Sequence, residues 1–480
     1  MGPLDHIGPG LLALTETAIL LRAILRPHRD PASRLAWVVV IVVLPIVGII
    51  AYLLLGEIRI SNRRRQRGRD VDRSLPTPDA DKSCEDELAK SDYAAPFALA
   101  RTVNGLGTTG GNQALLALDS NVAIDGLVED IDAARHHVHL CAYIWLADHN
   151  GCKVKDAVIR AAARGVKVRA LADALGSRLF IRSSHWRELI ASGADVRPAL
   201  PVGNPLWTVI RGRVDLRNHR KLTVIDNGVA WVGSQNVADP EFRIKPHYAP
   251  WVDIMTRWEG PVARHCQYLF ASDWIAEGGD DISALLSQPW PKRAKRPGEI
   301  AAQVIGTGPT VQVDSMPACF AELIHSARHE LVITTPYFVP DEQVLTALTS
   351  AARRGVETLL ALPKRNDSIV VAATSKSYYQ DLVGAGVKLL EYRCGLLHAK
   401  TMLVDRAVGL IGSANLDRRS FELNFENNIL FADKEFAEVI RARQDAFIAD
   451  CDPVTQADID RYGLVARLWQ NSIAMMSPIL

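Results

Sequence analysis

The feature that most constrains this chain is a motif that occurs twice with the same internal spacing. Each copy reads H-x-K-x4-D, and a G-S-x-N sequence begins seven residues after its aspartate. The fixed residues are His219, Lys221, Asp226, Ser234 and Asn236 in the first copy, and His398, Lys400, Asp405, Ser413 and Asn415 in the second. One copy would be weak evidence for a functional site, because a pattern of three fixed residues recurs by chance in unrelated proteins. Two copies with one spacing indicate two half-sites that join into one catalytic centre.

Other landmarks repeat around the motif. The segments 131–136 (IDAARH) and 324–329 (IHSARH) each lead into an apolar run, which ends at Tyr143-Ile144-Trp145 or Tyr337-Phe338-Val339. Alternating strand and helix patterns with short apolar strands indicate α/β layering. We therefore predict an α/β fold of two repeated halves, 113–297 and 298–480, each with a mixed β-sheet flanked by helices. Extra residues around 198–213 make a candidate loop over the active site in the first half.

Composition excludes some classes of protein. The 480 residues include 55 basic and 54 acidic side chains, so the whole chain is not a nucleic-acid-binding polycation. Its seven cysteines are scattered and include no C-x-x-C pair. That pattern argues against a disulfide framework or a zinc knuckle and suits a reducing compartment. We therefore expect the catalytic part to lie in the cytoplasm.

The N-terminal region, 1–58, is expected to be a membrane anchor of two apolar helices. Leu35 to Leu55 is a run without a charged side chain, and its 21 residues suffice to cross about 30 Å of hydrocarbon. Pro45 and Gly48 lie inside this run, and membrane helices tolerate such residues. An earlier apolar stretch, Ile7 to Leu25, carries polar residues and could either span the membrane or lie in its interface.

Residues 59–112 are expected to be a basic juxtamembrane linker with a short helical stretch near Glu85–Arg101. Seven arginines lie between Arg59 and Arg73, and the positive-inside tendency places this flank in the cytoplasm. The predicted location is therefore the bacterial cytoplasmic membrane, crossed more than once, with the catalytic domain facing the cytoplasm. The chain gives no signal for its oligomeric state.

The motif pattern also predicts how its side chains are arranged. Residues 219–225 read as a strand that a D-N-G turn ends, and residues i and i+2 of a strand share one face. His219 and Lys221 should therefore point the same way, as should His398 and Lys400. The two motif aspartates lie beyond the strands and are expected to tie the turn rather than transfer protons.

Two histidines, two lysines, two serines and two asparagines around one cavity suit phosphoryl transfer at a phosphodiester. One imidazole would attack phosphorus, and the other would protonate the leaving oxygen and then activate the incoming alcohol. Lys221, Lys400, Asn236 and Asn415 would neutralise the non-bridging oxygens. We expect no metal and no other cofactor, because no metal-ligand spacing is present. Asp253 and Glu426 are candidates to orient the rings, although either could serve in an ordinary buried salt bridge.

At these motifs the chain resembles the phospholipase D superfamily and, more narrowly, the membrane-anchored bacterial cardiolipin synthases. Three further runs carry the narrower resemblance: Asp30–Trp37, Thr335–Asp341 and Leu416–Phe421 continuing to Glu426. The resemblance implies that two phosphatidylglycerols give cardiolipin and glycerol. It implies that the first-half histidine, His219, is the nucleophile and His398 the general acid, although the roles could be reversed. One departure is Cys141-Ala142, where these enzymes usually carry an acidic residue.

The same residues are compatible with other functions. A phospholipase D-type lipid hydrolase would use the same residues with water as the acceptor, because acceptor choice depends on water exclusion. Phosphatidylethanolamine could replace phosphatidylglycerol as the second donor. A nuclease is disfavoured by the predicted anchor and by the balanced charge. A lipid-binding scaffold is disfavoured because both motif copies are intact.

Overall fold

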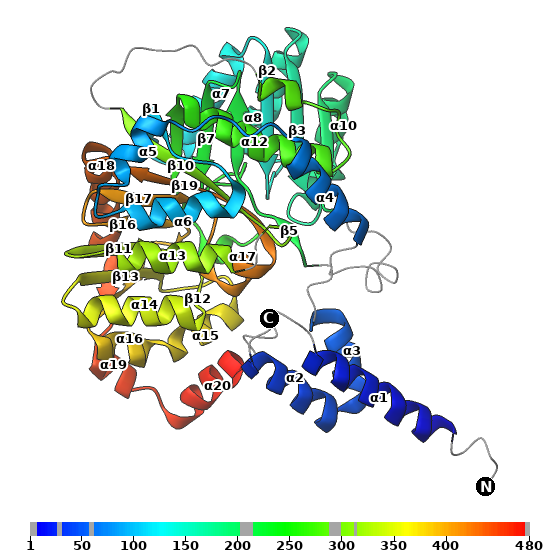
Figure 1. Ribbon diagram of the computed structural model, residues 1–480, viewed down its shortest axis with the longest axis vertical. Helices are drawn as coiled ribbons and strands as arrows, with labels where there is room; N and C mark the ends of the chain where they lie inside the picture. The colour runs from blue at the N-terminus through cyan, green and yellow to red at the C-terminus, as the bar shows by residue number, and fades with distance from the viewer. Residues whose placement is uncertain are drawn as a thin grey trace.

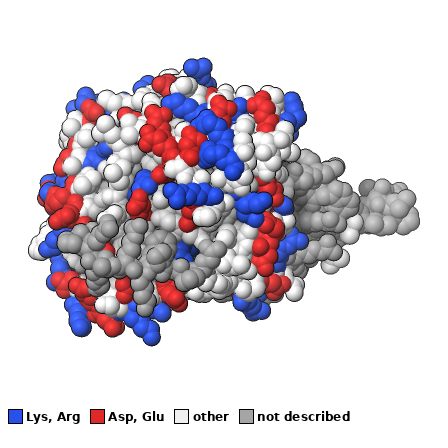
Figure 2. Space-filling view, turned by 90° about the horizontal axis from the view of Figure 1, so that it is seen from above, with Lys and Arg blue, Asp and Glu red and all other residues white. Residues whose placement is uncertain are grey.

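The computed structural model describes residues 7–25, 31–56, 62–201, 215–287, 299–311 and 314–475. A large sheet flanked by helices forms the main body, and three N-terminal helices extend from one end of it (Figure 1). Basic and acidic side chains intermingle on the face seen in Figure 2, in keeping with the balanced charge. Most of the predicted loop at 198–213 lies outside the described residues.

The two halves share one mixed sheet of 16 strands rather than two separate sheets. From one edge to the centre, the first half contributes β4 (Asp195–Ala199), β3 (Lys167–Asp173), β2 (His137–Ala142), β6 (Leu222–Ile225), β7 (Val229–Gly233), β9 (Met255–Glu259) and β1 (Thr109–Leu116). The second half continues with β10 (Ile300–Thr307), β19 (Asn424–Ala432), β17 (Val408–Gly412), β16 (Thr401–Val404), β11 (Glu330–Thr334), β13 (Glu357–Pro363), β14 (Lys388–Tyr392) and β20 (Cys451–Pro453). The order of one half mirrors that of the other. The antiparallel pair β1 and β10 joins them. The sixteenth strand, β5 (Arg217–Asn218), lies off this path and pairs with β19.

Each half has three parallel strands toward its outer edge and antiparallel strands toward the centre, and the edge strand β20 of the second half pairs antiparallel with β14. β2, β3 and β4 run parallel, as do β11, β13 and β14. Parallel strands need helical crossovers, and these are α8 (His149–Ala163) and α10 (Ser184–Ala191) in the first half, with α14 (Glu342–Arg353), α15 (Ile369–Ser377) and α16 (Tyr379–Ala385) in the second. The predicted repeat and α/β layering are therefore present in the structure.

The remaining main-body helices follow the same repeat. α7 (Ser120–Ala133) packs beside α8, and α13 (Ser315–His325) packs beside α14. Two long helices, α12 (Pro261–Ala276) and α18 (Lys434–Ala449), bury their apolar residues in one core that also includes residues of the central strands. The C-terminal helices are α19 (Gln456–Asp460) and α20 (Leu464–Met475).

The segment predicted as a linker contains three helices, α4 (Asn62–Ser74), α5 (Lys82–Leu88) and α6 (Ala94–Asn104). α6 buries Phe97, Ala100 and Val103 in the core of the second half. α4 lies against α12, where Arg64 forms an ion pair with Glu277. The apolar face of α6 explains why α6 packs into the core of the second half, because an amphipathic helix gains most of its stability from burying that face.

The N-terminal region differs from the predicted continuous helix over 35–55. It forms α1 (Ile7–Leu25), α2 (Pro31–Val43) and α3 (Pro45–Leu55), and Leu44 interrupts the apolar run with φ −131° and ψ 70°. Proline lacks an N–H and disfavours helical backbone at the preceding residue, which accounts for the break. No helix in the described part of the chain has both the length and the apolar character needed to cross a membrane.

The break folds the apolar run into a helical hairpin. The rings of Trp37 and Tyr52 are 5.3 Å apart, whereas a continuous helix would separate these residues by about 22 Å at 1.5 Å per residue. Gly48 allows the close approach, because a Cβ there would lie 2.5 Å from the Val40 carbonyl oxygen. The run expected to form one helix over 35–55 is therefore divided between α2 and α3, which pack against each other.

Candidate active site

Two short parallel strand pairings bring the motif histidines together. β5 (Arg217–Asn218) pairs with the start of β19, and β15 (Leu396–Leu397) pairs with β8 (Trp251–Val252). In both pairs a strand of one half joins a strand of the other. The backbone N–H groups that follow donate across the pairs, from His219 to the Phe425 carbonyl (2.9 Å) and from His398 to the Val252 carbonyl (2.8 Å).

Each histidine is held by a carboxylate of the opposite half. His219 Nδ1 lies 2.9 Å from Glu426 Oε2, and His398 Nδ1 lies 2.6 Å from Asp253 Oδ1. A protonated Nδ1 that donates to a carboxylate leaves Nε2 of the same ring free for chemistry. The site is therefore reciprocal, since neither half orients its own histidine.

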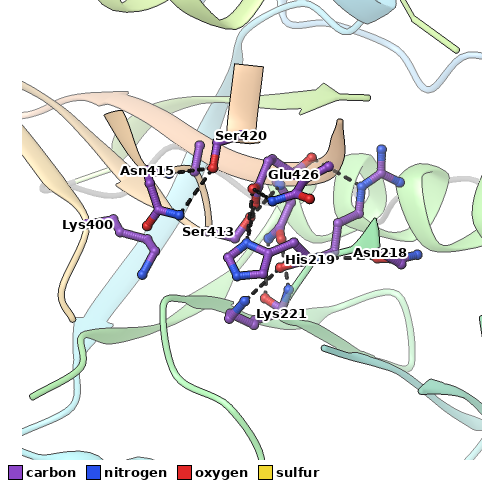
Figure 3. Close-up of polar contacts among 12 residues, drawn as sticks. Asn218, His219, Lys221, Lys400, Ser413, Asn415, Ser420 and Glu426 are labelled. Carbon is purple, nitrogen blue, oxygen red and sulfur yellow. Dashed lines mark hydrogen bonds and ion pairs between the residues drawn. The ribbon is translucent and has the colours of Figure 1, made fainter. Parts of the chain in front are cut away.

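The two motif serines lie behind these carboxylates. Ser234 Oγ donates to Asp253 Oδ1 (2.6 Å), and Ser413 Oγ donates to Glu426 Oε2. Each half thus contributes a serine and a carboxylate to the histidine of the other half. Figure 3 shows the set formed by Ser413, Glu426 and His219.

The motif lysines are buried beside the histidines. Lys221 Nζ donates to the His219 carbonyl (2.8 Å) and lies 5.1 Å from the centre of the Tyr143 ring. Lys400 Nζ donates to the His398 carbonyl (2.8 Å) and lies 3.2 Å from His398 Nε2. Burial lowers the pKa of Lys221 to about 8 and that of Lys400 to about 7.

The histidines are also shifted toward their neutral forms. Burial lowers the pKa of His219 to about 4, although the Glu426 carboxylate opposes the shift. Burial and the nearby Lys400 ammonium lower the pKa of His398. The carboxylates behave differently, because their interactions with the histidines and lysines outweigh burial and lower the pKa of both Asp253 and Glu426. Lys400 acts on His219 and Lys221 acts on His398, so the two half-sites share one electrostatic environment.

The motif asparagines are buried, at 5% exposure for Asn236 and 2% for Asn415. Asn415 Nδ2 donates to Ser420 Oγ (3.2 Å; Figure 3). Within the described residues, the Oδ1 atoms of both asparagines are buried without a hydrogen-bond partner. Buried polar atoms are rarely left unpaired without a reason, so a ligand or water at this place is expected.

Each motif aspartate directly follows the strand that begins after its motif lysine. Asp226 follows β6, and Asp405 follows β16. Asp226 accepts from the backbone N–H groups of Arg135, His136 and His137 at 2.7–2.9 Å. Asp405 accepts in the same way from residues 328–330. Both aspartates have φ 50° and open a tight turn. They tie that turn to the start of β2 or β11, and they have no contact with either motif histidine among the described residues.

Sequence reasoning missed the aromatic residues that surround the histidines. The Tyr143 ring lies edge-on to His219 with centroids 4.7 Å apart, and Tyr337 lies edge-on to His398 at 6.5 Å. Trp251 packs against His398 at 4.6 Å. The tyrosine near the end of each apolar run recurs in both halves, and this repeat could have identified Tyr143 and Tyr337 from the sequence. Cys141, at the departure noted above, contacts Asn218 Oδ1 through its Sγ at 3.4 Å.

Within the described residues, no group of three or more His, Cys, Asp or Glu side chains could hold a metal ion. Lys221 and Lys400 place their ammonium groups beside the histidines.

Comparison with known proteins identifies the family. A family described as "Cardiolipin synthase, PLD-like domain" matches residues 127–274 and 320–447, which contain both motif copies. Cardiolipin synthase A of Escherichia coli O1:K1 / APEC is 38% identical over 446 residues, which cover 91% of this chain and 90% of the relative. The chain belongs to the cardiolipin synthase family of the phospholipase D superfamily. The family assignment made from the motifs is confirmed.

Other comparisons agree with this assignment. Cardiolipin synthase A of E. coli strain K12 / DH10B matches with the same identity and coverage. A family described as "Phospholipase_D-nuclease N-terminal" matches residues 17–57, the region of the apolar helices. The phosphatidylserine synthase of Haemophilus influenzae Rd KW20 shares the fold, with a TM-score of 0.59 and 13% identity over 80% of this chain and 99% of that one.

Proposed function

We propose that this cardiolipin synthase family member transfers a phosphatidyl group between two phosphatidylglycerols, giving cardiolipin and glycerol. The observation that carries the proposal is the reciprocal site, in which Glu426 orients His219 and Asp253 orients His398. It supplies one neutral imidazole for attack and a second imidazole for proton transfer, which a two-step displacement requires.

In the first step, His219 Nε2 attacks the phosphorus of one phosphatidylglycerol. The bond from phosphorus to the glycerol oxygen breaks, and that oxygen takes a proton from His398. His398 is neutral at rest, so it first takes this proton from the Lys400 ammonium, whose Nζ lies 3.2 Å from His398 Nε2, and both groups end the step neutral. Lys221, Asn236 and Asn415 stabilise the charge on the non-bridging oxygens throughout, and Lys400 does so until it gives up its proton.

In the second step, a hydroxyl of the second phosphatidylglycerol gives its proton to the neutral His398, which returns it to Lys400. Its oxygen attacks the phosphohistidine, the phosphorus–nitrogen bond breaks, and neutral His219 is restored. A dry site favours this acceptor over water, and burial of both histidines, at 7% and 2% exposure, supports that condition.

We further propose that α1, α2 and α3 embed in the bacterial cytoplasmic membrane, with the catalytic body on the cytoplasmic side. Large apolar side chains on these helices are exposed in the isolated chain, among them Leu14 (69%), Val43 (67%) and Ile46 (61%). Lipid would cover such surfaces. The predicted multi-pass topology stays a prediction, which protease accessibility in intact spheroplasts and inverted vesicles would test.

The experiment for the reaction is an incubation of detergent-solubilised protein with labelled phosphatidylglycerol, followed by separation of the lipid products. Cardiolipin and free glycerol are expected, and both should disappear in His219→Ala and His398→Ala. Phosphatidic acid as the main product would instead make the protein a hydrolase. Added phosphatidylethanolamine that enters the product would change the assigned second donor.

A further inference from the structure

The C-terminal helix α20 turns its large apolar side chains outward. Leu464, Val465, Leu468, Trp469 and Met475 are 74%, 81%, 58%, 54% and 76% exposed. At 100° per residue these positions share one side of the helix. A helix of a soluble domain normally turns its apolar side toward the core. α20 instead turns its large apolar side chains toward the outside.

The opposite side of α20 faces the protein and carries one large apolar residue, Ile473, among small or polar ones. Gln470 is buried, and Ala466, Ile473 and Ala474 are partly buried. α20 packs closely along α15. The outward direction of the apolar stripe is therefore fixed by a defined contact with the main body.

α15 begins on the side of His398 where Tyr337, Asp367 and Lys245 lie, and we call this side the mouth of the active site. Asp367, two residues before α15, accepts from the Tyr337 hydroxyl (2.7 Å), and the Tyr337 ring is edge-on to His398. Asp367 also pairs with Lys245 Nζ (2.6 Å). An exposed apolar residue lies near each member of this ion pair in the sequence. Ile244 precedes Lys245 and is 49% exposed, and Ile369 follows Asp367 by two residues and is 71% exposed.

We infer that the outward face of α20, together with Ile244 and Ile369, docks the mouth of the active site on an anionic lipid surface. The inference rests on the proposed function, because a lipid substrate must enter this mouth from a bilayer. We name this set of residues the docking face. It would hold the catalytic body against the membrane in addition to the N-terminal helices.

Three features favour lipid over a protein partner. α20 has no acidic residue, and its exposed Arg467 flanks the apolar stripe, as in helices that lie in an anionic interface. Trp469 is a residue type enriched at membrane interfaces. In Figure 1, α20 lies at the same lower end of the molecule as α1–α3.

The test compares Val465→Asp/Leu468→Asp with the unmodified full chain on two substrates. One is phosphatidylglycerol in vesicles, and the other is a short-chain phosphatidylglycerol below its critical micelle concentration. We expect about a tenfold lower rate on vesicles and a rate within about twofold on the monomeric lipid. Ile190→Asp is the matched control, because Ile190 is 55% exposed on α10, away from the docking face, and should leave both rates unchanged.

Equal rates of the variant and the unmodified chain on vesicles would overturn the inference. An equal loss on both substrates would also overturn it, because α20 would then support the fold of the site. So would a dimer that the variant converts to a monomer, since the stripe would then be a protein interface.

A second measurement separates this inference from the proposed reaction. Vesicles that contain brominated lipid should quench Trp469, so Trp469→Phe should lower the quenchable part of the fluorescence. This difference in quenchable fluorescence is expected even if neither substrate yields cardiolipin. Absence of cardiolipin would refute the proposed reaction but not the docking face. An unchanged quenchable part would refute the docking face.

Discussion

At the scale of single residues, each motif histidine is oriented by a carboxylate of the opposite half. Glu426→Gln removes the charge that orients His219 and stabilises its positive form. We expect the rate of cardiolipin formation to fall by about 100-fold without loss of the fold, because misplacing a catalytic group by a small distance costs that much. Asp253→Asn should act likewise through His398.

The matched control for Glu426→Gln is Glu330→Gln. Glu330 also pairs with a basic group, Arg441, but lies at the start of β11. Rates should be normalised to folded protein, measured by near-UV circular dichroism. An equal loss of rate in the Glu330 variant would show that the Glu426 effect is not specific to the site.

The lysines predict an alkaline limit to activity. The pKa of Lys400 is lowered to about 7 and that of Lys221 to about 8, and each ammonium is lost as pH rises through its pKa. The charge that stabilises the non-bridging oxygens is therefore present below these values, and kcat/KM should fall as pH rises through about 7 to 8. A profile on monomeric phosphatidylglycerol from pH 6 to 10 checks this. A rate that stays flat to pH 10 would contradict it.

At the scale of elements, we expect the motif aspartates to contribute to the stability of the fold and not directly to the reaction. Asp226→Ala leaves three backbone N–H groups without their acceptor, so we expect a loss of about 2 kcal/mol in the free energy of unfolding. The rate per folded molecule should stay within about threefold, because Asp226 holds a turn and contacts neither motif histidine.

Denaturant unfolding in detergent, with activity measured on the same samples, checks the Asp226 prediction. The pKa of Asp226 is lowered, so its contribution to stability is present above the unfolded pKa and lost as pH falls through the folded one. A variant of full stability but no activity would instead give the aspartate a direct catalytic role.

Some elements could be predicted from local sequence and others could not. The D-N-G sequence predicted the turn after β6, and Asp226 and Asn227 there have φ 50° and 55°. The matching turn of the second half places Arg406 at φ 51°, and no glycine or asparagine signals it. The hydropathy of 35–55 was visible, but the hairpin depends on Pro45 and on the contact of Trp37 with Tyr52, which hydropathy does not encode.

At the scale of the whole molecule, the repeat predicted the architecture and the composition of the site. The identical spacing of the motifs required two similar halves, and the mirrored strand order has that form. The sequence could not predict that the halves share one sheet, because pairing of β1 with β10 is a long-range contact. Nor could it assign each carboxylate to the opposite histidine, which depends on the crossed pairings of β5 and β8.

The central claim is that both halves form one centre in which His219 attacks and His398 transfers protons. It is tested most directly with a phosphatidyl ester of p-nitrophenol, whose leaving group needs no protonation. In His398→Ala, the account predicts a burst of one nitrophenolate per enzyme and a phosphatidyl group trapped on His219, found by mass spectrometry at alkaline pH. His219→Ala should give no burst. A burst in His219→Ala with the adduct on His398 would contradict the assigned roles, and the absence of any adduct in both variants would contradict the covalent mechanism.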